Sequence, residues 1–378
     1  MNKDPASIEV ISSGHTAAHI HGKSKPRIQW LLNPNASTAW WVPIVSIVLA
    51  LLFCGMFIAL NGINPITVYA KMFTGAFGST YGFSETLVKA IPLLLCGLGV
   101  SIAYRIGIWN IGAEGQFIAG AIAATGITIY WPGLSGMWSI PVMMAAGMAG
   151  GALWGLFTAI PRTVFRVNEL ITSLMLNYIA ILCMDYFVFG PWKDPKGMNF
   201  PGTPIFSLGQ QLLTLGSSRL HMGLIFGLIA VVLYAICMKY TRWGYELRLL
   251  GANPDAATYA GIAVNKHIIL VMLISGGLAG LAGMSEVSGV THRLMYGLSP
   301  GYGYTAIIVA WLAKLRPLGL IVSSVLFGGL IVGGYSVQTI GLPASLSLML
   351  QGAILFFLIA GDHLGRYRLH RSQPRMKV

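Results

Sequence analysis

The chain has 378 residues, of which 55% are hydrophobic and only 9% are charged, and its mean hydropathy is +0.72. A soluble domain carries roughly a quarter charged residues, so this composition argues against a soluble enzyme, a disordered chain and a disulfide-framed secreted module. The net charge of +13 does not indicate nucleic-acid binding, because Lys and Arg gather in the cytoplasmic loops of membrane proteins. The composition therefore predicts an all-α, polytopic protein of the lipid bilayer.

The first 37 residues are polar, and we expect them to form a cytoplasmic arm. Within this arm, Gly22-Lys23-Ser24 matches the last three residues of the phosphate-binding loop pattern GxxxxGK[ST]. The first glycine of that pattern is missing, because position 17 is Ala17, so no nucleotide site is assigned. Residues 38–361 are expected to form the transmembrane domain, and residues 362–378 a basic cytoplasmic tail.

Ten apolar segments follow the arm, chosen with about 20 residues per span as a guide. The segment at 302–313 is too short to cross alone, and the join at 104–109 is tight. We therefore expect about ten transmembrane helices, with broken or half-helices near 104–110 and 302–316. The segments are 40–60, 85–104, 109–130, 138–160, 169–190, 222–239, 267–287, 302–313, 318–338 and 344–361.

The distribution of basic residues predicts the orientation. With ten crossings and a cytoplasmic N-terminus, 18 of the 24 Lys and Arg residues fall inside. The reverse orientation would place only 6 inside, contrary to the positive-inside rule. Both termini are therefore predicted to be cytoplasmic.

Two connections are long. The outer loop 191–221 is rich in Pro, Gly and Ser, and it is interpreted as either a plain surface loop or a docking site for an external partner. In the inner loop 240–266, Asn253 can cap a helix that begins at Pro254, and Gly261 is a natural stop. The loop therefore predicts a short amphipathic helix at 254–260, which could instead rest passively on lipid.

Three blocks of sequence resemble permease subunits of ABC importers. The inner loop resembles the coupling loop of the branch that handles sugars, nucleosides and branched-chain amino acids, and the second block looks like the signature of nucleoside-type permeases. Together the matches cover most of residues 85–361. The blocks are Gly251-Ala252-Asn253-Pro254 with Ala256-Ala257 and Ala260-Gly261-Ile262, then Asn110-Ile111-Gly112-Ala113-Glu114-Gly115-Gln116-Phe117, and Gly301-Tyr302-Gly303-Tyr304-Thr305-Ala306-Ile307.

The resemblance implies a permease subunit that forms half of the pathway of an ATP-driven importer, for a nucleoside or a related sugar-like solute. Such a subunit is not an enzyme, because separate ABC ATPase subunits hydrolyse ATP. Its implied partners are those ATPases, a second permease (a paralogue or a copy) and an extracytoplasmic substrate-binding protein. No cofactor, metal or nucleic acid is expected, and the implied location is the cell membrane. The sequence leaves open which nucleoside, base or sugar is carried.

The resemblance also places candidate sites. Coupling to the ATPase is expected at Gly251, Asn253, Pro254, Ala256, Ala257, Tyr259 and Gly261. Aromatic faces stack on bases and amides bond to hydroxyls, so the candidate substrate pathway comprises Asn110, Glu114, Gln116, Asn177, Tyr178, Tyr302, Tyr304 and Trp311.

Two interpretations stay open for Asn110 and Glu114, which are four residues apart and can share one helix face. They form either a cluster of hydrogen-bonded side chains that stabilises the fold or a contact with substrate. Asp185 and Glu286 are expected at interfacial, hydrated positions.

Small residues within the apolar segments are interpreted as packing features. The glycine pairs are expected to be close-packing seams, and the cysteines to be packing residues rather than a metal site or disulfide framework. These residues are Gly147 and Gly151, Gly276 and Gly280, Gly329 and Gly333, and Cys54, Cys96, Cys183 and Cys237.

Two other classes of membrane protein are alternatives. An ion-coupled secondary transporter would use Glu114 as a proton or cation site, but it would leave the 244–262 block unexplained. An intramembrane enzyme would need a catalytic constellation, and the sequence has no HExxH, no GxSxG and no paired carboxylates with an attendant His.

Overall fold

The computed structural model describes residues 28–32, 41–134, 136, 138–198, 200–216, 218–364 and 367–371. The chain divides into two compact units, one of Met1–Ala39 with Asp362–Val378 and one of Trp40–Gly361.

The smaller unit contains two short strands, β1 (Ile28–Leu32) and β2 (Tyr367–Arg371). They pair antiparallel, with Ile28 opposite Arg371 and Leu32 opposite Tyr367. Neither strand was predicted, because two short segments from opposite ends of a chain give no local signal of pairing. The Gly22-Lys23-Ser24 segment lies outside the described residues.

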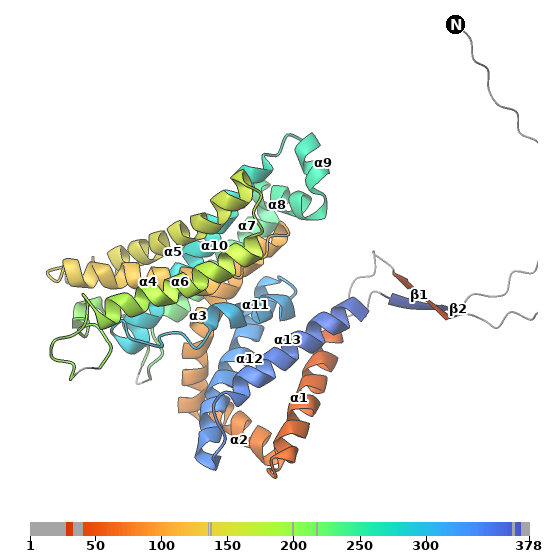
Figure 1. Cartoon of the computed structure of the whole chain (residues 1–378). Coiled ribbons are helices and arrows are strands. Elements are labelled where there is room, and N and C mark those ends of the chain that lie inside the picture. Colours follow the sequence, from red (N-terminus) through yellow and green to blue (C-terminus); the bar gives the residue numbers. More distant parts are fainter. Residues whose placement is uncertain are drawn as a thin grey trace, which may run out of the picture. The chain divides into compact units, whose positions relative to one another are not determined.

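The larger unit is a bundle of helices (Figure 1). A π-helical turn at Val287–Thr291 extends α10, and short 3-10 turns occur at Leu208–Gln210 and Val337–Ile340. The α-helices are α1 (Val42–Leu60), α2 (Pro65–Phe77), α3 (Thr80–Arg105), α4 (Ala113–Tyr130), α5 (Ser139–Val164), α6 (Glu169–Phe189), α7 (Gly223–Tyr240), α8 (Arg242–Ala252), α9 (Pro254–Tyr259), α10 (Val264–Glu286), α11 (Tyr302–Leu312), α12 (Pro317–Ser336) and α13 (Leu346–Leu364).

All ten predicted apolar segments are confirmed as helices. Among the described residues, eight helices are long and apolar enough to cross a membrane: α1, α3, α5, α6, α7, α10, α12 and α13. The other two are α4, whose first turn carries Glu114, and α11, which has only 11 residues. The predicted breaks before α4 and around α11 are therefore confirmed.

Burial separates the centre of the bundle from its periphery. In the apolar windows of α3 and α10, 89% and 72% of residues are buried, against 22% for α5 and 28% for α6 and α7. The outer helices thus expose much of their apolar surface, as expected of helices that face lipid or another subunit.

Glycine seams bring several helices of the bundle into close contact. A Cβ atom on Gly151 of α5 would overlap the carbonyl oxygen of Gly276 on α10, and one on Gly280 would overlap the carbonyl of Gly147. The two predicted glycine pairs therefore form one seam, and small residues there let the backbones touch. The third pair on α12 packs against Phe77 and Met72 of α2, so the packing prediction is confirmed there too.

Two helices were not predicted, namely α2 and α8. Each begins with a local cap: the Asn64 side chain accepts from the N–H of Ile66, and the Thr241 side chain accepts from the N–H of Gly244. These helices have 13 and 11 residues, so a search for spans of about 20 residues passes over them.

Candidate functional site

A helical pair, α8 and α9, fills the long loop between α7 and α10. The Asn253 Oδ1 accepts from the N–H groups of Asp255 (3.0 Å) and Ala256 (3.1 Å), which caps α9. Pro254 takes the first helical position, where no N–H is needed, and Gly261 follows the helix with a φ of +81°. The helix predicted at 254–260 is therefore confirmed as α9.

Three contacts join α8 to the membrane helices. The Glu246 Oε2 lies 3.0 Å from the His267 Nε2 on α10. The Arg248 guanidinium donates to the backbone carbonyl of Met238, near the end of α7. Gly251 lies so close to the end of α3 that a Cβ atom there would overlap the carbonyl oxygen of Arg105. A displacement of α8 would therefore reach α3, α7 and α10 directly.

The seven predicted coupling residues do not share one environment. Ala257 is fully buried within the chain, whereas Tyr259 is 93% exposed. Gly251 is exposed on its outer side but packs on α3 as described. The remaining predicted coupling residues are exposed, namely Asn253, Pro254, Ala256 and Gly261.

The broken segment between α3 and α4 is fixed by a buried amide cluster. The Asn110 Nδ2 donates to the Gln116 Oε1 (2.9 Å) and to the Ser275 Oγ on α10 (2.8 Å). The Asn110 Oδ1 accepts from the N–H of Gly112 (3.0 Å). All three side chains are buried, so the cluster satisfies polar groups that lipid could not.

Asn177 of α6 completes this cluster from the other side. Its Oδ1 accepts from the N–H of Gly115 (2.8 Å), and its Nδ2 donates to the carbonyl of Ile111 (3.0 Å) and to the Tyr304 hydroxyl (3.2 Å). The neighbouring Tyr178 is 56% exposed and lies outside the cluster.

Two helix N-termini meet at Glu114. This residue lies in the first turn of α4, and its Oε2 accepts from the N–H of Gly303 in the first turn of α11 (2.6 Å). A carboxylate is favoured where the positive ends of helix dipoles converge. Glu114 is 3% exposed, so its contacts favour a role in stabilising the fold over direct contact with substrate.

Trp311 lies elsewhere, in an aromatic cluster with Tyr104 and Trp109. Its ring centroid is 5.5 Å from that of Trp109 and 6.0 Å from that of Tyr104. The cluster packs the C-terminal end of α11 against the broken segment before α4.

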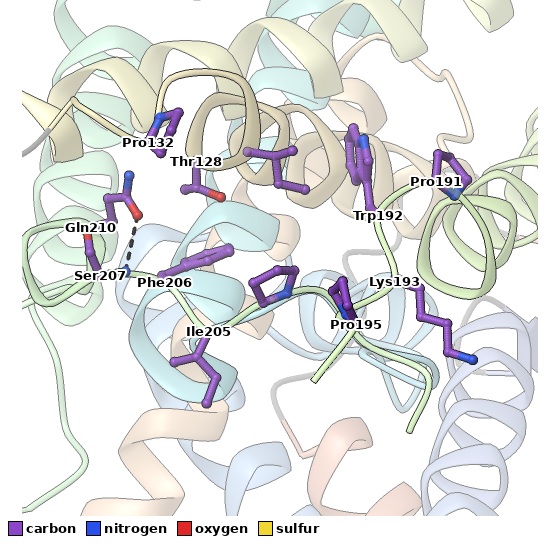
Figure 2. A pocket seen from close by; sticks show the side chains of 12 residues that line it. Thr128, Pro132, Pro191, Trp192, Lys193, Pro195, Ile205, Phe206, Ser207 and Gln210 are labelled. Atoms are coloured by element: carbon purple, nitrogen blue, oxygen red, sulfur yellow. Dashed lines mark hydrogen bonds between the residues drawn. The ribbon is translucent and has the colours of Figure 1, made fainter. Parts of the chain in front are cut away.

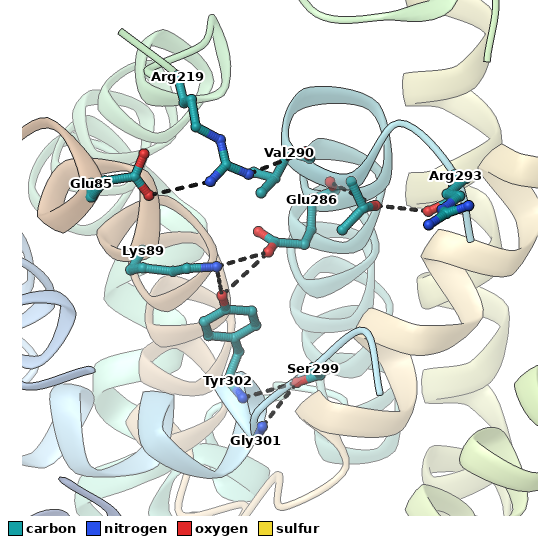
Figure 3. A network of polar contacts seen from close by, with 10 residues as sticks. Glu85, Lys89, Arg219, Glu286, Val290, Arg293, Ser299, Gly301 and Tyr302 are labelled. Atoms are coloured by element: carbon teal, nitrogen blue, oxygen red, sulfur yellow. Dashed lines mark hydrogen bonds and ion pairs between the residues drawn. The ribbon is translucent and has the colours of Figure 1, made fainter. Parts of the chain in front are cut away.

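A charged network joins α3, α10 and α11 (Figure 3). The Lys89 Nζ lies 3.2 Å from the Glu286 Oε1 and donates to the Tyr302 hydroxyl at 2.8 Å. Glu286 is 3% exposed, so the predicted hydrated interfacial position is wrong for this residue. Sequence spacing could not pair Lys89 with Glu286, because they lie on helices far apart in the chain.

Two further acidic residues lie near or within the spans. Glu85 lies one turn before Lys89 on α3, and its Oε2 is 3.7 Å from the Arg219 Nη1 of the loop 191–221. Asp185 of α6 is half-buried, and its Oδ1 has no hydrogen-bond partner in the part of the chain that the structure describes.

The described residues of the loop 191–221, together with the end of α4, line a cavity of about 460 Å³ (Figure 2). The Trp192 ring stacks on Phe187, with centroids 4.1 Å apart, and its Nε1 donates to the Tyr130 hydroxyl (3.3 Å). The Gln210 Oε1 accepts from the N–H of Ser207 (3.2 Å). These contacts make the loop a fixed, concave surface at the ends of α4 and α6.

The described residues contain no group of three or more His, Cys, Asp or Glu that could hold a metal ion. A bundle in which eight of the described helices are long and apolar enough to cross a membrane is the fold of a multi-pass membrane protein. The chain belongs to the family of the branched-chain amino acid transport system permease component, which matches residues 82–359. It is thus a permease of this family.

Three relatives illustrate the similarity. The chain is 33% identical to the glucose ABC transporter permease protein TsgB13 of Haloferax volcanii, over 90% of this chain and 94% of that protein. It is 32% identical to the guanosine ABC transporter permease protein NupP of Bacillus subtilis, over 88% of this chain and 97% of that protein. NupQ, a second guanosine ABC transporter permease protein of B. subtilis, is 29% identical over 64% of this chain and 78% of its own length.

Proposed function

We propose that this permease forms half of the translocation pathway of an ATP-driven importer for a nucleoside or a related sugar-like solute. The relatives named for guanosine and glucose support this substrate class. On this proposal the chain hydrolyses no ATP itself, and ABC ATPase subunits supply the work.

The proposal rests on one observation: α9 is a capped, exposed helix that is joined to the membrane helices through α8. This helix is capped at Asn253, ends at Gly261 and exposes Tyr259, while α8 ties it to three membrane helices. A rigid exposed helix with such ties can carry a movement of a seated ATPase into the spans. Of the predicted coupling residues, we assign the contact to Asn253, Pro254, Ala256, Tyr259 and Gly261, and we assign packing to Gly251 and Ala257.

The remaining partners follow from the same proposal. A second permease completes the pathway, and the match to both NupP and NupQ favours a paralogue. The outer loop then faces an extracytoplasmic substrate-binding protein. Residues 38–361 form the membrane domain of the cell membrane, with the arm 1–37 and the tail 362–378 both in the cytoplasm.

The polar centre is proposed to hold the half-helices rather than to bind solute. Asn110, Glu114, Gln116 and Asn177 satisfy one another and the backbone, so they keep α4 and α11 in register. Tyr304 joins them through Asn177. Because its ring is only half-buried, we assign to Tyr304 the position in this group that is most accessible to a solute.

The test replaces exposed residues of α9 in the assembled transporter. Tyr259→Ala and Ala256→Arg should leave the permease in the membrane at normal levels, but should remove both ATPase co-purification and solute uptake. Thr339→Arg, at an exposed position of the loop between α12 and α13, is the matched control and should retain both.

Full uptake with a stable ATPase complex in both α9 variants would contradict the assignment of α9. Proton-coupled uptake by this chain alone would contradict the ATP-driven function and would favour a secondary transporter.

A further inference from the structure

A small cavity lies between α11, α12 and α13, with a mostly apolar lining into which a few polar side chains reach. Its volume is about 180 Å³, and its lining includes Ser345, an exposed residue of the loop that joins α12 to α13. In the orientation proposed above, this loop is on the outer face of the membrane. The cavity is separate from the amide cluster around Asn110.

One wall of the cavity carries a buried amide that is only partly satisfied. The Gln351 Oε1 accepts from the Thr305 Oγ1 at 2.7 Å, while the Nε2 is buried and has no hydrogen-bond partner among the described residues. Gln351 is 3% exposed. Because Thr305 meets only one end of the amide, one polar atom stays free whichever way the amide is turned. A buried polar group without a partner is costly, so this position calls for a ligand atom.

The other walls supply complementary groups. Tyr302 lines the cavity at a fully buried position, and its hydroxyl is held by Lys89 (2.8 Å), whereas Tyr335 is 48% exposed and offers the accessible aromatic ring. Tyr335, Ser345 and Ser347 add hydroxyl-bearing side chains. The Ser347 hydroxyl donates to a backbone carbonyl of the same loop at 2.9 Å, which leaves its oxygen free to accept.

An aromatic ring, an amide and several hydroxyls around one small space suit a polyhydroxylated ring. The ring of a sugar packs on an aromatic face, and its hydroxyls both donate and accept. The volume is smaller than the roughly 300 Å³ at which pockets for drug-sized ligands begin. A single sugar ring fits this space better than a whole nucleoside.

We propose that this cavity is a subsite for the sugar ring of the transported solute, with the Gln351 amide bonded to a ring hydroxyl. The proposal rests on the function proposed above, and it names the part of the solute that is recognised. The base of a nucleoside would project from the cavity beside Ser345.

The experiment measures uptake of labelled guanosine and of labelled glucose by the assembled transporter in proteoliposomes. Gln351→Leu removes the amide, and Gln338→Leu makes the same change at an exposed position that does not line the cavity. Ser345→Trp narrows the mouth, and Thr339→Trp is its control in the same loop.

We expect Gln351→Leu to raise the KM for the transported solute about tenfold, as for the loss of one buried hydrogen bond, with folded yield retained. Unlabelled ribose should compete with guanosine uptake in the wild type and should lose this effect in Gln351→Leu. Ser345→Trp should also raise the KM, and both controls should behave as the wild type.

An unchanged KM in both Gln351→Leu and Ser345→Trp, with guanosine or glucose uptake intact, would overturn the subsite alone and would assign the free amide atom to water. If Gln351→Leu does not fold, Ser345→Trp at the exposed mouth decides the question. If the wild-type assembly takes up no nucleoside and no sugar, guanosine and glucose included, the proposed function fails and the subsite fails with it.

Discussion

The capped helix α9 and the meeting point of α4 and α11 are built in opposite ways. In α9, the cap, the first proline and the terminal glycine lie within nine residues of sequence, from Asn253 to Gly261, and most of the side chains are exposed. At the meeting point, Glu114 and Gly303 come from distant parts of the chain and are both buried.

This difference predicts which property a substitution in each region should impair. An exposed helix held by local contacts can lose a side chain and stay folded, so its variants should fail in association. A buried junction of two half-helices cannot relax into water or lipid, so its variants should fail in folding.

The largest effect is expected from Gly303→Ala. A Cβ atom there would overlap the backbone of Glu114, and a backbone atom cannot turn aside as a side chain can. We expect a loss of about 4 kcal/mol or more, measured as folded yield and melting temperature in detergent. Gly352→Ala is the matched control, because a Cβ atom there meets nothing within 4 Å; an equal loss in both variants would contradict the close approach.

Lys89→Met should be next in size. It leaves the Glu286 carboxylate buried without its ion pair, and such a loss costs about 3–5 kcal/mol. Adding Glu286→Leu should restore most of the melting temperature, because the uncompensated charge is then gone. A double variant no more stable than Lys89→Met would show that the pair is not coupled.

His221 should make the outer end of the bundle sensitive to acid. Burial, with the nearby side chains of His292, Lys89 and Arg219, lowers the pKa of His221 from 6.5 to about 4. Between these values the unfolded chain binds a proton that the folded chain does not, so stability falls as the pH falls. From pH 7 to pH 5 the expected loss is about 2 kcal/mol. His221→Gln should flatten the melting temperature over this range, and an unchanged slope would refute this role.

The smallest effect on folding is expected from Asn253→Ala. Loss of this cap costs about 1 kcal/mol and is confined to α9, so the melting temperature of the bundle should hold. Hydrogen exchange at the amides of Asp255 and Ala256 should become faster, and solute uptake should fall. Protected amides in the variant would show that α9 does not depend on its cap.

The sequence by itself determined the elements whose signals are local or repetitive. Ten apolar segments predicted ten helices, because a chain in lipid satisfies its backbone groups within a helix, and eight of them are long and apolar enough to span among the described residues. Asn253, Pro254 and Gly261 gave the bounds of α9, because a cap, a first-turn proline and a left-handed glycine act on adjacent residues. The breaks before α4 and at α11 followed from segment length.

The tertiary structure alone decided which distant groups meet. It paired Lys89 with Glu286 and Glu114 with Gly303, and it left one end of the Gln351 amide free in a cavity. It also turned Ala257 inward, although its neighbours at both ends of α9 are exposed. None of these outcomes has a sequence signal, because apolar helices of similar length can pack in many registers. The choice among registers is made by where glycines allow close approach and where buried polar atoms find partners.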